Sequence, residues 1–315
     1  MSVDYLRDHS EFEDLIRIVA EEKGIDPALI EKDYWIMHCL HGLQKQGYTF
    51  SLKGGTSLSK GLKIINRFSE DIDILIEPPA GRYVKVGRNQ DSAVQIKTRV
   101  DFYDWLAQTI KIDGISTVER DVTFDDKPNY RSAGIRLNYN GRSAPLEGLR
   151  NGVLLELGFD VVAPNTPRDI SSWLYDRAAS MVEIIDNRAK AVPCYDAGYT
   201  LVEKLQTVST KFRKQQQSGE SPVEFMRHYY DIYSLLRRSE VQKFIGTETY
   251  RAHQKRRFRQ GDNQNIAQNE AFILSNAKTL ATYANAYETS GALYYADKPS
   301  FEQILAEIKQ RIEEL

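Results

Sequence analysis

Two adjacent glycines, Gly54 and Gly55, stand between an apolar segment and an amphipathic one. Residues 48–52 have the pattern of a short strand, and residues 57–65 that of a helix. Glycines let the backbone turn sharply between the two, and the start of a helix leaves N–H groups unpaired. A second strand is predicted at residues 72–76, where apolar residues alternate. The order strand, glycine turn, helix, strand restricts this part of the chain to a sheet with a helix packed on it.

The segments on either side extend this core in two different ways. Residues 11–42 predict two helices, and after a further helix at 94–110 three β-like runs follow at 115–124, 133–139 and 153–159. After Pro193 the apolar residues recur at helical spacing. We therefore predict an α+β fold with a mixed β-sheet core and three domains. These are N-terminal helices (1–45), the sheet core (46–192) and a C-terminal helical domain (193–315).

Composition constrains the environment more than the function. The 42 basic and 44 acidic side chains leave a net charge of −2, so any charged binding surface must be local. Two distant cysteines, Cys39 and Cys194, match no disulfide framework or metal motif. The first residues lack an apolar core, and no run approaches the ~20 apolar residues of a membrane span. We expect a cytoplasmic protein without a membrane partner.

The glycine turn has the features of a phosphate cradle. Backbone N–H groups at a helix start favour an anion, and glycine permits its close approach. The hydroxyls of Thr56 and Ser57 could cap the helix or donate to phosphate oxygens, and Lys60 lies one turn further on. The alternative is a turn with a purely structural role.

Asp71 and Asp73 are separated by one residue on the second strand, which places both carboxylates on one face. Two like charges repel, and a bound divalent metal would neutralise them, whereas the alternative is a solvated strand edge. Carboxylate oxygens favour Mg2+ or Mn2+ over zinc. His38 and His41 could share a helix face, but we interpret them as packing or surface residues.

In combination these motifs resemble the nucleotidyltransferase superfamily and, more narrowly, the AbiEii/AbiGii toxin family, which includes the MenT toxins. The resemblance rests on residues 54–60 (GGTSLSK) and 67–73 (RFSEDID), and residues 31–35 (EKDYW) match a further family feature. It extends from about residue 30 into the C-terminal helices. It implies a nucleotidyltransferase-like core, a nucleoside triphosphate (NTP) as substrate and a cognate antitoxin as partner.

The resemblance also implies roles for residues outside the two motifs. By position, Lys204 and Asp231 match a lysine and an aspartate that the family carries on two helices, and Glu156 matches a strand-borne carboxylate that acts as metal ligand or base. The alternatives are a surface lysine and an exposed ion pair between Arg227 and Asp231.

The implied reaction is attack by an acceptor hydroxyl on the α-phosphate of an NTP, with release of pyrophosphate. The expected catalytic residues are Asp71, Asp73, Lys204 and Asp231; the nucleotide-binding residues are Gly54, Gly55, Thr56, Ser57, Lys60 and Ser69; and the metal ligands are Asp71, Asp73 and Glu156. Two alternatives remain open. One is a metal-dependent phosphotransferase acting on a protein or a small molecule, and the other is a catalytically inactive nucleotide- or RNA-binding module.

The resemblance further implies that the acceptor is RNA, and we expect the 3′ end of transfer RNA (tRNA). Residues 204–259 contain 13 Lys and Arg against five Asp and Glu, whereas the whole chain is nearly neutral. Their densest part, residues 255–259 (KRRFR), pairs basic charge with Phe258, which we expect to stack on a base. The alternative is a solvated basic loop.

Overall fold

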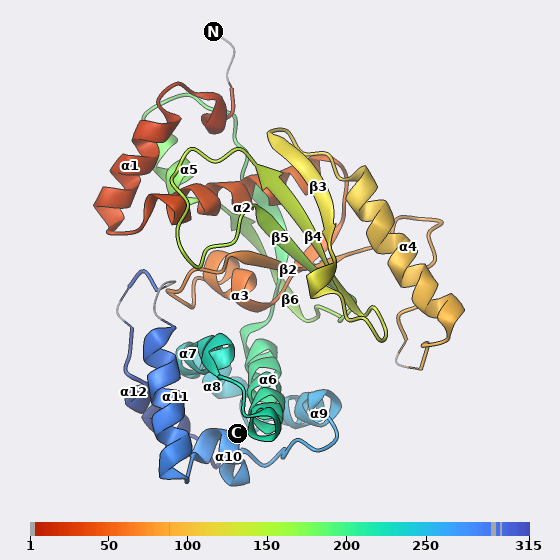
Figure 1. Ribbon diagram of the computed structural model, residues 1–315, viewed down its shortest axis with the longest axis vertical. Coiled ribbons are helices and arrows are strands. Elements are labelled where there is room, and N and C mark those ends of the chain that lie inside the picture. The colour runs from red at the N-terminus through yellow and green to blue at the C-terminus, as the bar shows by residue number, and fades with distance from the viewer. Residues whose placement is uncertain (1–3, 88, 291–293, 297) are drawn as a thin grey trace. The chain divides into compact units, whose positions relative to one another are not determined.

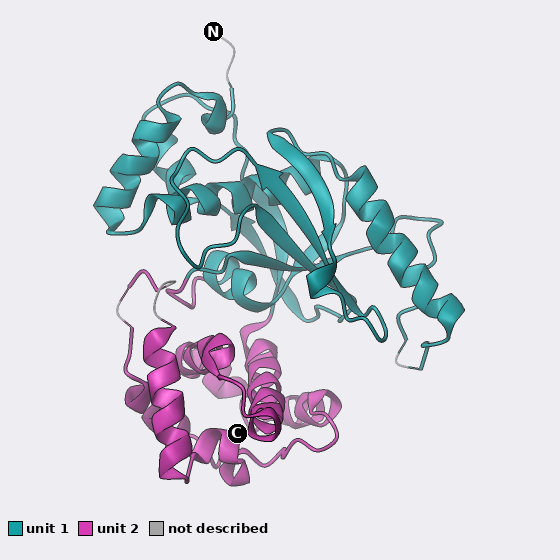
Figure 2. Cartoon of the chain, viewed as in Figure 1, with its two compact units in different colours: residues 1–62, 68–195 teal, residues 63–67, 196–315 magenta. Residues whose placement is uncertain are grey.

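The computed structural model describes residues 4–87, 89–290, 294–296 and 298–315. The chain divides into two compact units (Figure 2): unit 1 comprises residues 1–62 and 68–195, and unit 2 comprises 63–67 and 196–315. The last boundary lies close to the expected domain border after residue 192, and the N-terminal helices form part of unit 1. The chain therefore passes from one unit to the other three times.

Unit 1 is built on a mixed sheet whose described strands run in the order β3-β4-β5-β2-β1-β7-β6 (Figure 1). The strands are β1 (Phe50–Leu52), β2 (Asp71–Ile76), β3 (Ile115–Asp121), β4 (Ser132–Tyr139), β5 (Val153–Gly158), β6 (Asn165–Ile170) and β7 (Ala189–Tyr195). Strand β2 lies between β5, to which it is parallel, and β1, to which it is antiparallel. The mixed sheet confirms the expected α+β fold and places β2 inside the sheet.

The helices of unit 1 pack around this sheet. They are α1 (Phe12–Lys23), α2 (Pro27–Lys45), α3 (Gly54–Thr56), η2 (Ser57–Gly61), α4 (Ala93–Thr109) and α5 (Trp173–Ala178), with short turns η1 (Leu6–Asp8) and η3 (Val122–Phe124). Helix α2 begins at Pro27 because the Asp26 carboxylate accepts a hydrogen bond from the Ala28 N–H at 2.8 Å. It packs on β5 and β7, and α4 packs on β3. The apolar face of β2 (Ile72, Ile74 and Ile76) is buried in this core.

Unit 2 is helical in its described residues. Its elements are α6 (Ala197–Ser218), η4 (Val223–Phe225), α7 (Met226–Leu236), α8 (Ser239–Phe244), α9 (Glu248–Arg257), η5 (Ile266–Gln268), α10 (Glu270–Ile273), α11 (Ala277–Thr289) and α12 (Phe301–Gln310). Helix α6 starts where the Asp196 carboxylate caps two N–H groups and ends at Gly219, whose φ is +70°. It packs against α7 and α9, and α12 packs against α7. The predicted C-terminal helices are confirmed.

A short segment, Lys63–Arg67, belongs to unit 2 although its chain neighbours belong to unit 1. We call it the strap. Its carbonyl groups at Lys63 and Ile64 accept hydrogen bonds from Arg238 Nη2 at 3.2 and 3.3 Å, and the Asn66 N–H donates to the Tyr230 hydroxyl at 3.0 Å. The strap is thus fixed to α7 and to the residues that directly follow it.

Candidate active site

Strand β2 presents two carboxylates on one face, and β5 adds a third. Asp73 pairs in register with Glu156 on the parallel strand β5, while Asp71 pairs with Leu154. Because directly opposite residues share a face and side chains alternate along a strand, Asp71, Asp73 and Glu156 lie on the same face of the sheet. We call this surface the carboxylate face. The structure therefore places Asp71 and Asp73 on one face of a strand, as their spacing predicts.

The glycine turn lies directly beside Asp73. Gly54 has a φ of +60°, and a Cβ atom at this position would collide with the Asp73 carboxylate. The Gly55 N–H donates a hydrogen bond to Asp73 Oδ2 at 3.2 Å. Glycine is thus required at residue 54 both for the backbone conformation and for room beside the carboxylate. The two sequence motifs form one local structure.

Arg150 places a positive charge on the carboxylate face. Its Nη1 atom donates to Asp71 Oδ2 at 2.8 Å and lies 3.7 Å from Glu70 Oε1. The guanidinium also lies over the ring of Phe124, at 5.0 Å from the centroid. Because 44% of its side chain is exposed, the guanidinium can move without leaving a buried void. Sequence analysis missed Arg150, which stands in a turn-rich stretch without periodic signal.

Lys53 adds a second positive charge to this face. Its N–H donates to the Asp73 carbonyl at 3.0 Å, which places Lys53 opposite Asp73 on the antiparallel neighbour strand. Its Nζ lies 3.6 Å from Asp160 and close to Gly158, which follows Glu156 by two residues. The ammonium therefore reaches across β2 towards β5. Sequence analysis missed Lys53, although this lysine stands directly before the glycine pair.

Helix α2 anchors the main chain that carries these groups. The buried ammonium of Lys32 forms an ion pair with Glu70 at 3.3 Å and donates to the Arg150 carbonyl at 2.7 Å. The Arg150 N–H in turn donates to Glu70 at 3.1 Å. Burial lowers the pKa of Lys32, and the charges of Glu70 and Asp71 oppose this shift. The backbone of Arg150 is thus fixed, whereas its guanidinium is half-exposed.

The neighbouring residues of α2 hold other loops. The Glu31 carboxylate accepts hydrogen bonds from the N–H groups of Arg142 and Ser143, the latter at 2.8 Å. Asp33 forms a buried ion pair with Lys60 and accepts a hydrogen bond from the Trp173 N–H at 2.9 Å. The EKDYW motif therefore acts as an internal anchor for the site.

This geometry changes the role that we assign to Lys60. Its ammonium is paired with Asp33, and it also donates to the Ser171 carbonyl at 3.1 Å. Only 10% of the side chain is exposed. We therefore give Lys60 a structural role and omit it from the proposed nucleotide-binding residues.

The hydroxyls of the turn face the interior of the fold. The Thr56 hydroxyl donates to the Asp71 carbonyl at 2.5 Å and lies 3.3 Å from the Ser69 hydroxyl. Thr56 and Ser57 are both fully buried, whereas Ser69 is partly exposed. In this arrangement neither Thr56 nor Ser57 can present a hydroxyl to a phosphate. Thr56 ties the turn to the start of β2, whereas the Ser57 hydroxyl faces the Cys194 thiol of β7. Ser69 remains a candidate ligand.

The carboxylate face fits a magnesium ion by its chemistry. All three side chains offer hard oxygen donors, and Mg2+ is commonly bound by one or two carboxylates together with substrate phosphates. Within the described residues, no group of three His, Cys, Asp or Glu side chains is arranged to hold a metal ion on its own. Asp71 and Asp73 could bind the ion with triphosphate oxygens completing its shell. The third ligand, Glu156, stays a prediction.

The histidines of α2 belong to the packing of unit 1, as expected. His38 is buried, with hydrogen bonds to the Asp113 carbonyl at 2.9 Å and to Asn187 at 2.8 Å. Burial lowers its pKa to about 4, so the ring is neutral at pH 7. His41 stacks beside it.

The remaining predicted residues, Lys204 and Asp231, form a buried ion network in unit 2. The Asp231 carboxylate accepts hydrogen bonds from Arg67 Nε and Nη2 at 2.7 and 2.8 Å, and lies 2.8 Å from Lys204 Nζ. Asp231 is fully buried and the other two side chains are less than 10% exposed. Asp231 thus joins the strap to α6 through two cations. Because Asp231 is buried and pairs with Arg67 and Lys204, it does not form the exposed ion pair with Arg227 that the helical spacing allowed.

Electrostatics keep this network charged. Burial raises the pKa of Asp231, but the charges of Arg67 and Lys204 outweigh burial and hold this pKa well below its usual range. Burial, together with the charges of Lys204 and Arg227, lowers the pKa of His228 well below its usual value. The neutral His228 ring lies 3.4 Å from Lys204 Nζ. The ion pair at 2.8 Å between Asp231 and Lys204 therefore fixes the position of the Lys204 ammonium.

The basic segment at residues 255–259 differs from its predicted form. Phe258 is buried and cannot stack on a base, so this expectation was wrong. Arg257 pairs with Glu203 at 2.6 Å, and Arg256 contacts His253 at 2.8 Å. Apolar spacing along α9 gave no indication that Phe258 would turn inward.

A mixed sheet that carries a glycine turn beside a row of carboxylates agrees with the nucleotidyltransferase class that the sequence motifs indicate. A model of the family "Nucleotidyl transferase AbiEii toxin, Type IV TA system" matches residues 39–307, and the chain belongs to this family. The family consists of toxins of toxin–antitoxin systems, which implies an antitoxin partner. No curated protein sequence matches the chain.

Among solved structures, the chain is similar to an antigenic nucleotidyltransferase-like protein from Paracoccidioides brasiliensis. The two are 15% identical with a TM-score of 0.32, over 72% of this chain and 88% of the other. Separately, no helix in the described part of the chain is both long and apolar enough to cross a membrane.

Proposed function

We propose that this toxin-type nucleotidyltransferase transfers a nucleoside monophosphate from an NTP to an RNA acceptor, the 3′ end of tRNA, in the cytoplasm. An acceptor hydroxyl attacks the α-phosphorus, a new phosphodiester bond forms, and the bond to the leaving pyrophosphate breaks. The hydroxyl proton passes to a base or to water. Family membership supports the transfer reaction, and the acceptor is our proposal.

One observation carries the assignment of the reacting centre. Asp71, Asp73 and Glu156 share one sheet face beside a glycine turn, and Arg150 and Lys53 reach the same face. Carboxylates that bind metal and cations that bind phosphate are the two components that phosphoryl-type transfer requires. The carboxylate face is therefore the proposed site for the triphosphate.

The residues of unit 1 have distinct proposed roles. Asp71 and Asp73 would hold Mg2+ or Mn2+, which would neutralise charge on the phosphate oxygens. The backbone at Gly54 and Gly55 allows the triphosphate to approach, and Arg150 would transfer its hydrogen bonds from Asp71 to a phosphate. In unit 2, we propose that Lys204, oriented by Asp231, neutralises charge that develops in the transition state.

Charge distribution supports an RNA acceptor. The +8 segment at residues 204–259 contrasts with a total charge of −2, so the rest of the chain carries −10. Lys255, Arg256 and Arg259 are exposed on or after α9 and can neutralise backbone phosphates. Base stacking must come from other aromatic residues, because Phe258 is buried.

The test is incubation of the purified protein with Mg2+, total cellular RNA and each α-labelled NTP in turn, followed by identification of the labelled product. We expect label on tRNA together with released pyrophosphate. Label on a protein or small molecule would show that RNA is not the acceptor. Transfer of a γ-label with release of nucleoside diphosphate would indicate a phosphotransferase. If no NTP gives a labelled product, the chain is a binding module.

A further inference from the structure

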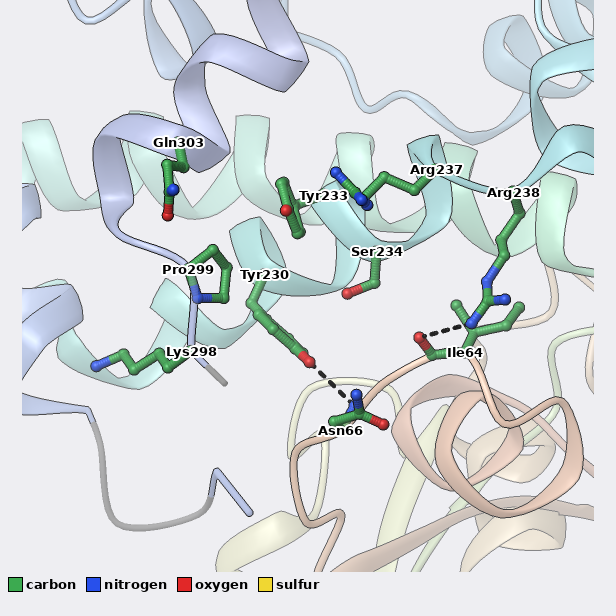
Figure 3. A pocket seen from close by; sticks show the side chains of 10 residues that line it. All are labelled: Ile64, Asn66, Tyr230, Tyr233, Ser234, Arg237, Arg238, Lys298, Pro299 and Gln303. Carbon is green, nitrogen blue, oxygen red and sulfur yellow. Dashed lines mark hydrogen bonds between the residues drawn. The ribbon is translucent and has the colours of Figure 1, made fainter. Parts of the chain in front are cut away.

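Unit 2 contains a pocket of about 560 Å³ that none of the assignments above uses (Figure 3). One face of α7 forms its floor through Tyr230, Tyr233, Ser234 and Arg237, which recur at helical spacing. The strap contributes Asn66 on one side. Pockets of a few hundred to about 1,000 Å³ are typical of small-ligand sites. The volume is therefore sufficient for a nucleotide-sized group.

The pocket is positively charged. Its described lining residues include Arg237, Arg238 and Lys298 and no acidic side chain. The Arg237 side chain is 58% exposed, and its guanidinium lies 3.8 Å from the Glu307 carboxylate, beyond hydrogen-bond distance, which leaves it available to a ligand. Arg238 donates through Nη2 to two strap carbonyls, which fixes the plane of its guanidinium beside the pocket. Arg237 therefore presents an available cation to the pocket, and Arg238 adds a fixed positive charge to its lining.

Lys298 has a different role. Its ammonium donates to the Tyr287 carbonyl at 2.8 Å, at the end of α11, and lies over the Tyr287 ring. In Figure 3 its nitrogen accordingly points away from Tyr230 and Ser234. Lys298 therefore lines the pocket with its stem, and we do not include it among the anion ligands.

The lining also provides a flat aromatic surface and polar groups. The Arg237 guanidinium lies over one face of the Tyr233 ring, 5.2 Å from its centroid, so a base would stack on the opposite face. A planar ring held beside a guanidinium is a suitable platform for a nucleobase. Asn66, Ser234 and Gln303 add amide and hydroxyl groups to the lining of the pocket. A negative charge, a planar ring and hydrogen-bonding edges are together the features of a nucleotide.

We propose that this pocket binds one nucleotide unit of the acceptor RNA strand, with its phosphate on Arg237 and Arg238 and its base against Tyr233. The choice of an RNA strand over a free nucleotide rests on the proposed function. The chemistry of the lining does not depend on that function.

The test measures RNA binding without Mg2+ or NTP, so that it does not depend on catalysis. The probe is a fluorescein-labelled single-stranded RNA of about eight nucleotides, and its anisotropy is followed with the full chain at several KCl concentrations. The variants are Arg237→Gln and Tyr233→Leu. Arg17→Gln, which changes an exposed arginine on α1 in unit 1, is the matched control. Melting temperatures establish that each variant is folded.

We expect Arg237→Gln and Tyr233→Leu each to weaken RNA binding about tenfold, since a stacked base or an anion contact is commonly worth this much. Arg237→Gln should also reduce the slope of log K against log salt by about 0.7, the value for one phosphate on a single strand. The control should bind RNA as the unchanged protein does. Free AMP and CMP should compete only weakly with the RNA.

Each other outcome overturns a defined part of the proposal. Unchanged affinity in both variants would show that RNA does not use the pocket. If only Arg237→Gln weakens RNA binding, the base does not stack on Tyr233. Competition by free AMP or CMP at the affinity of the RNA would make this a site for a free nucleotide. Failure of the proposed function is seen separately, as absence of RNA labelling by the unchanged protein with Mg2+ and NTP.

Discussion

The carboxylate face of unit 1 and the ion network of unit 2 are built from the same kinds of side chain but differ in accessibility. On the carboxylate face, Asp71 is paired with an arginine whose side chain is 44% exposed, and Asp73 is partly exposed. In the ion network, Asp231 is fully buried between Arg67 and Lys204. The first arrangement can exchange its partner for a ligand. The second cannot do so without leaving a buried charge unpaired.

This difference in accessibility distinguishes aspartates that can contact a ligand directly from one that can act only through its neighbours. Asp71 and Asp73 can contact metal and substrate directly, so their loss should affect chemistry more than folding. Asp231 acts through Lys204 and the strap, so its loss should affect folding as well as chemistry. The following four predictions test this distinction.

The largest effect is expected for Asp71→Asn and Asp73→Asn. Each change removes a charge that the proposed metal requires while keeping size and strand geometry, so we expect at least about a 1,000-fold loss of nucleotidyl transfer. In the Asp73→Asn variant, the side-chain amide oxygen can still accept the hydrogen bond from the Gly55 N–H. Single-turnover rates with labelled NTP, together with urea unfolding, measure both properties. Transfer near the unchanged rate in either variant would refute the metal assignment.

Removal of the central anion of unit 2 should destabilise the protein strongly. Asp231→Ala leaves Arg67 and Lys204 buried without their carboxylate, which typically costs about 3–5 kcal/mol. Lys204→Met should cost less, because Asp231 keeps its two hydrogen bonds to Arg67. Equilibrium urea unfolding gives both values.

Activity of the Lys204→Met variant then sharpens the comparison. A stably folded variant that binds NTP but transfers poorly supports a direct role for the ammonium. If it transfers at the unchanged rate, the network has only a structural role.

The pH dependence of stability provides a smaller test within the same network. The pKa of His228 lies well below its usual value near 6.5 because of burial and of the Lys204 charge. The unfolded chain therefore takes up a proton below about pH 6.5 that the folded protein does not, and stability decreases as the pH falls. Replacement of His228 by Gln should reduce the stability loss between pH 7.5 and 5.5 by about 1 kcal/mol. An identical loss in the variant, measured by urea unfolding, would contradict this assignment.

The smallest effect on stability is expected on the carboxylate face, for Arg150→Gln. Its ion pair with Asp71 is half-exposed, so the free energy of unfolding should change by less than about 1 kcal/mol. Without the competing guanidinium, Mn2+ should bind several-fold more tightly, whereas NTP should bind about tenfold more weakly. Calorimetry measures both affinities, with Arg17→Gln as the control. A decrease in Mn2+ affinity would show that Arg150 supports the metal site rather than competing for it.

Local patterns predicted much of the fold. The alternation of Ile72, Ile74 and Ile76 predicted β2, and Asp26 with Pro27 explains the break between the first two helices. Strands β6 and β7 were not predicted, because each contains a proline and β6 is almost entirely exposed. Pro167 and Pro193 lie opposite each other in the β6–β7 pair. The helical spacing after Pro193 does not reveal that α10 and α11 are separate helices, divided at Leu274, whose φ is +47°.

The candidate site was predictable only as far as short spacings determine geometry. The spacing of Asp71 and Asp73 placed both on one face. Glu156 was predicted only from the family resemblance, and the pairing of β2 with β5 brings it to the same face. Burial of Thr56 and Ser57 depends on how the short helix after the turn packs, which their spacing does not reveal. The partner of Asp231 is Arg67, 164 residues earlier, and no local pattern connects the two.

The strap has a consequence for how this protein can be divided. Because residues 63–67 belong to unit 2 and are followed by unit 1 again, no single cut in the gene separates the two units. Deletion of everything after Tyr195 would remove Asp231. Arg67, four residues before Asp71, would then lose the carboxylate with which it pairs. A shortened sheet unit would carry a damaged connection next to the strand that holds Asp71 and Asp73. Loss or exchange of the helical unit during evolution would thus require coordinated changes at two distant places in the gene.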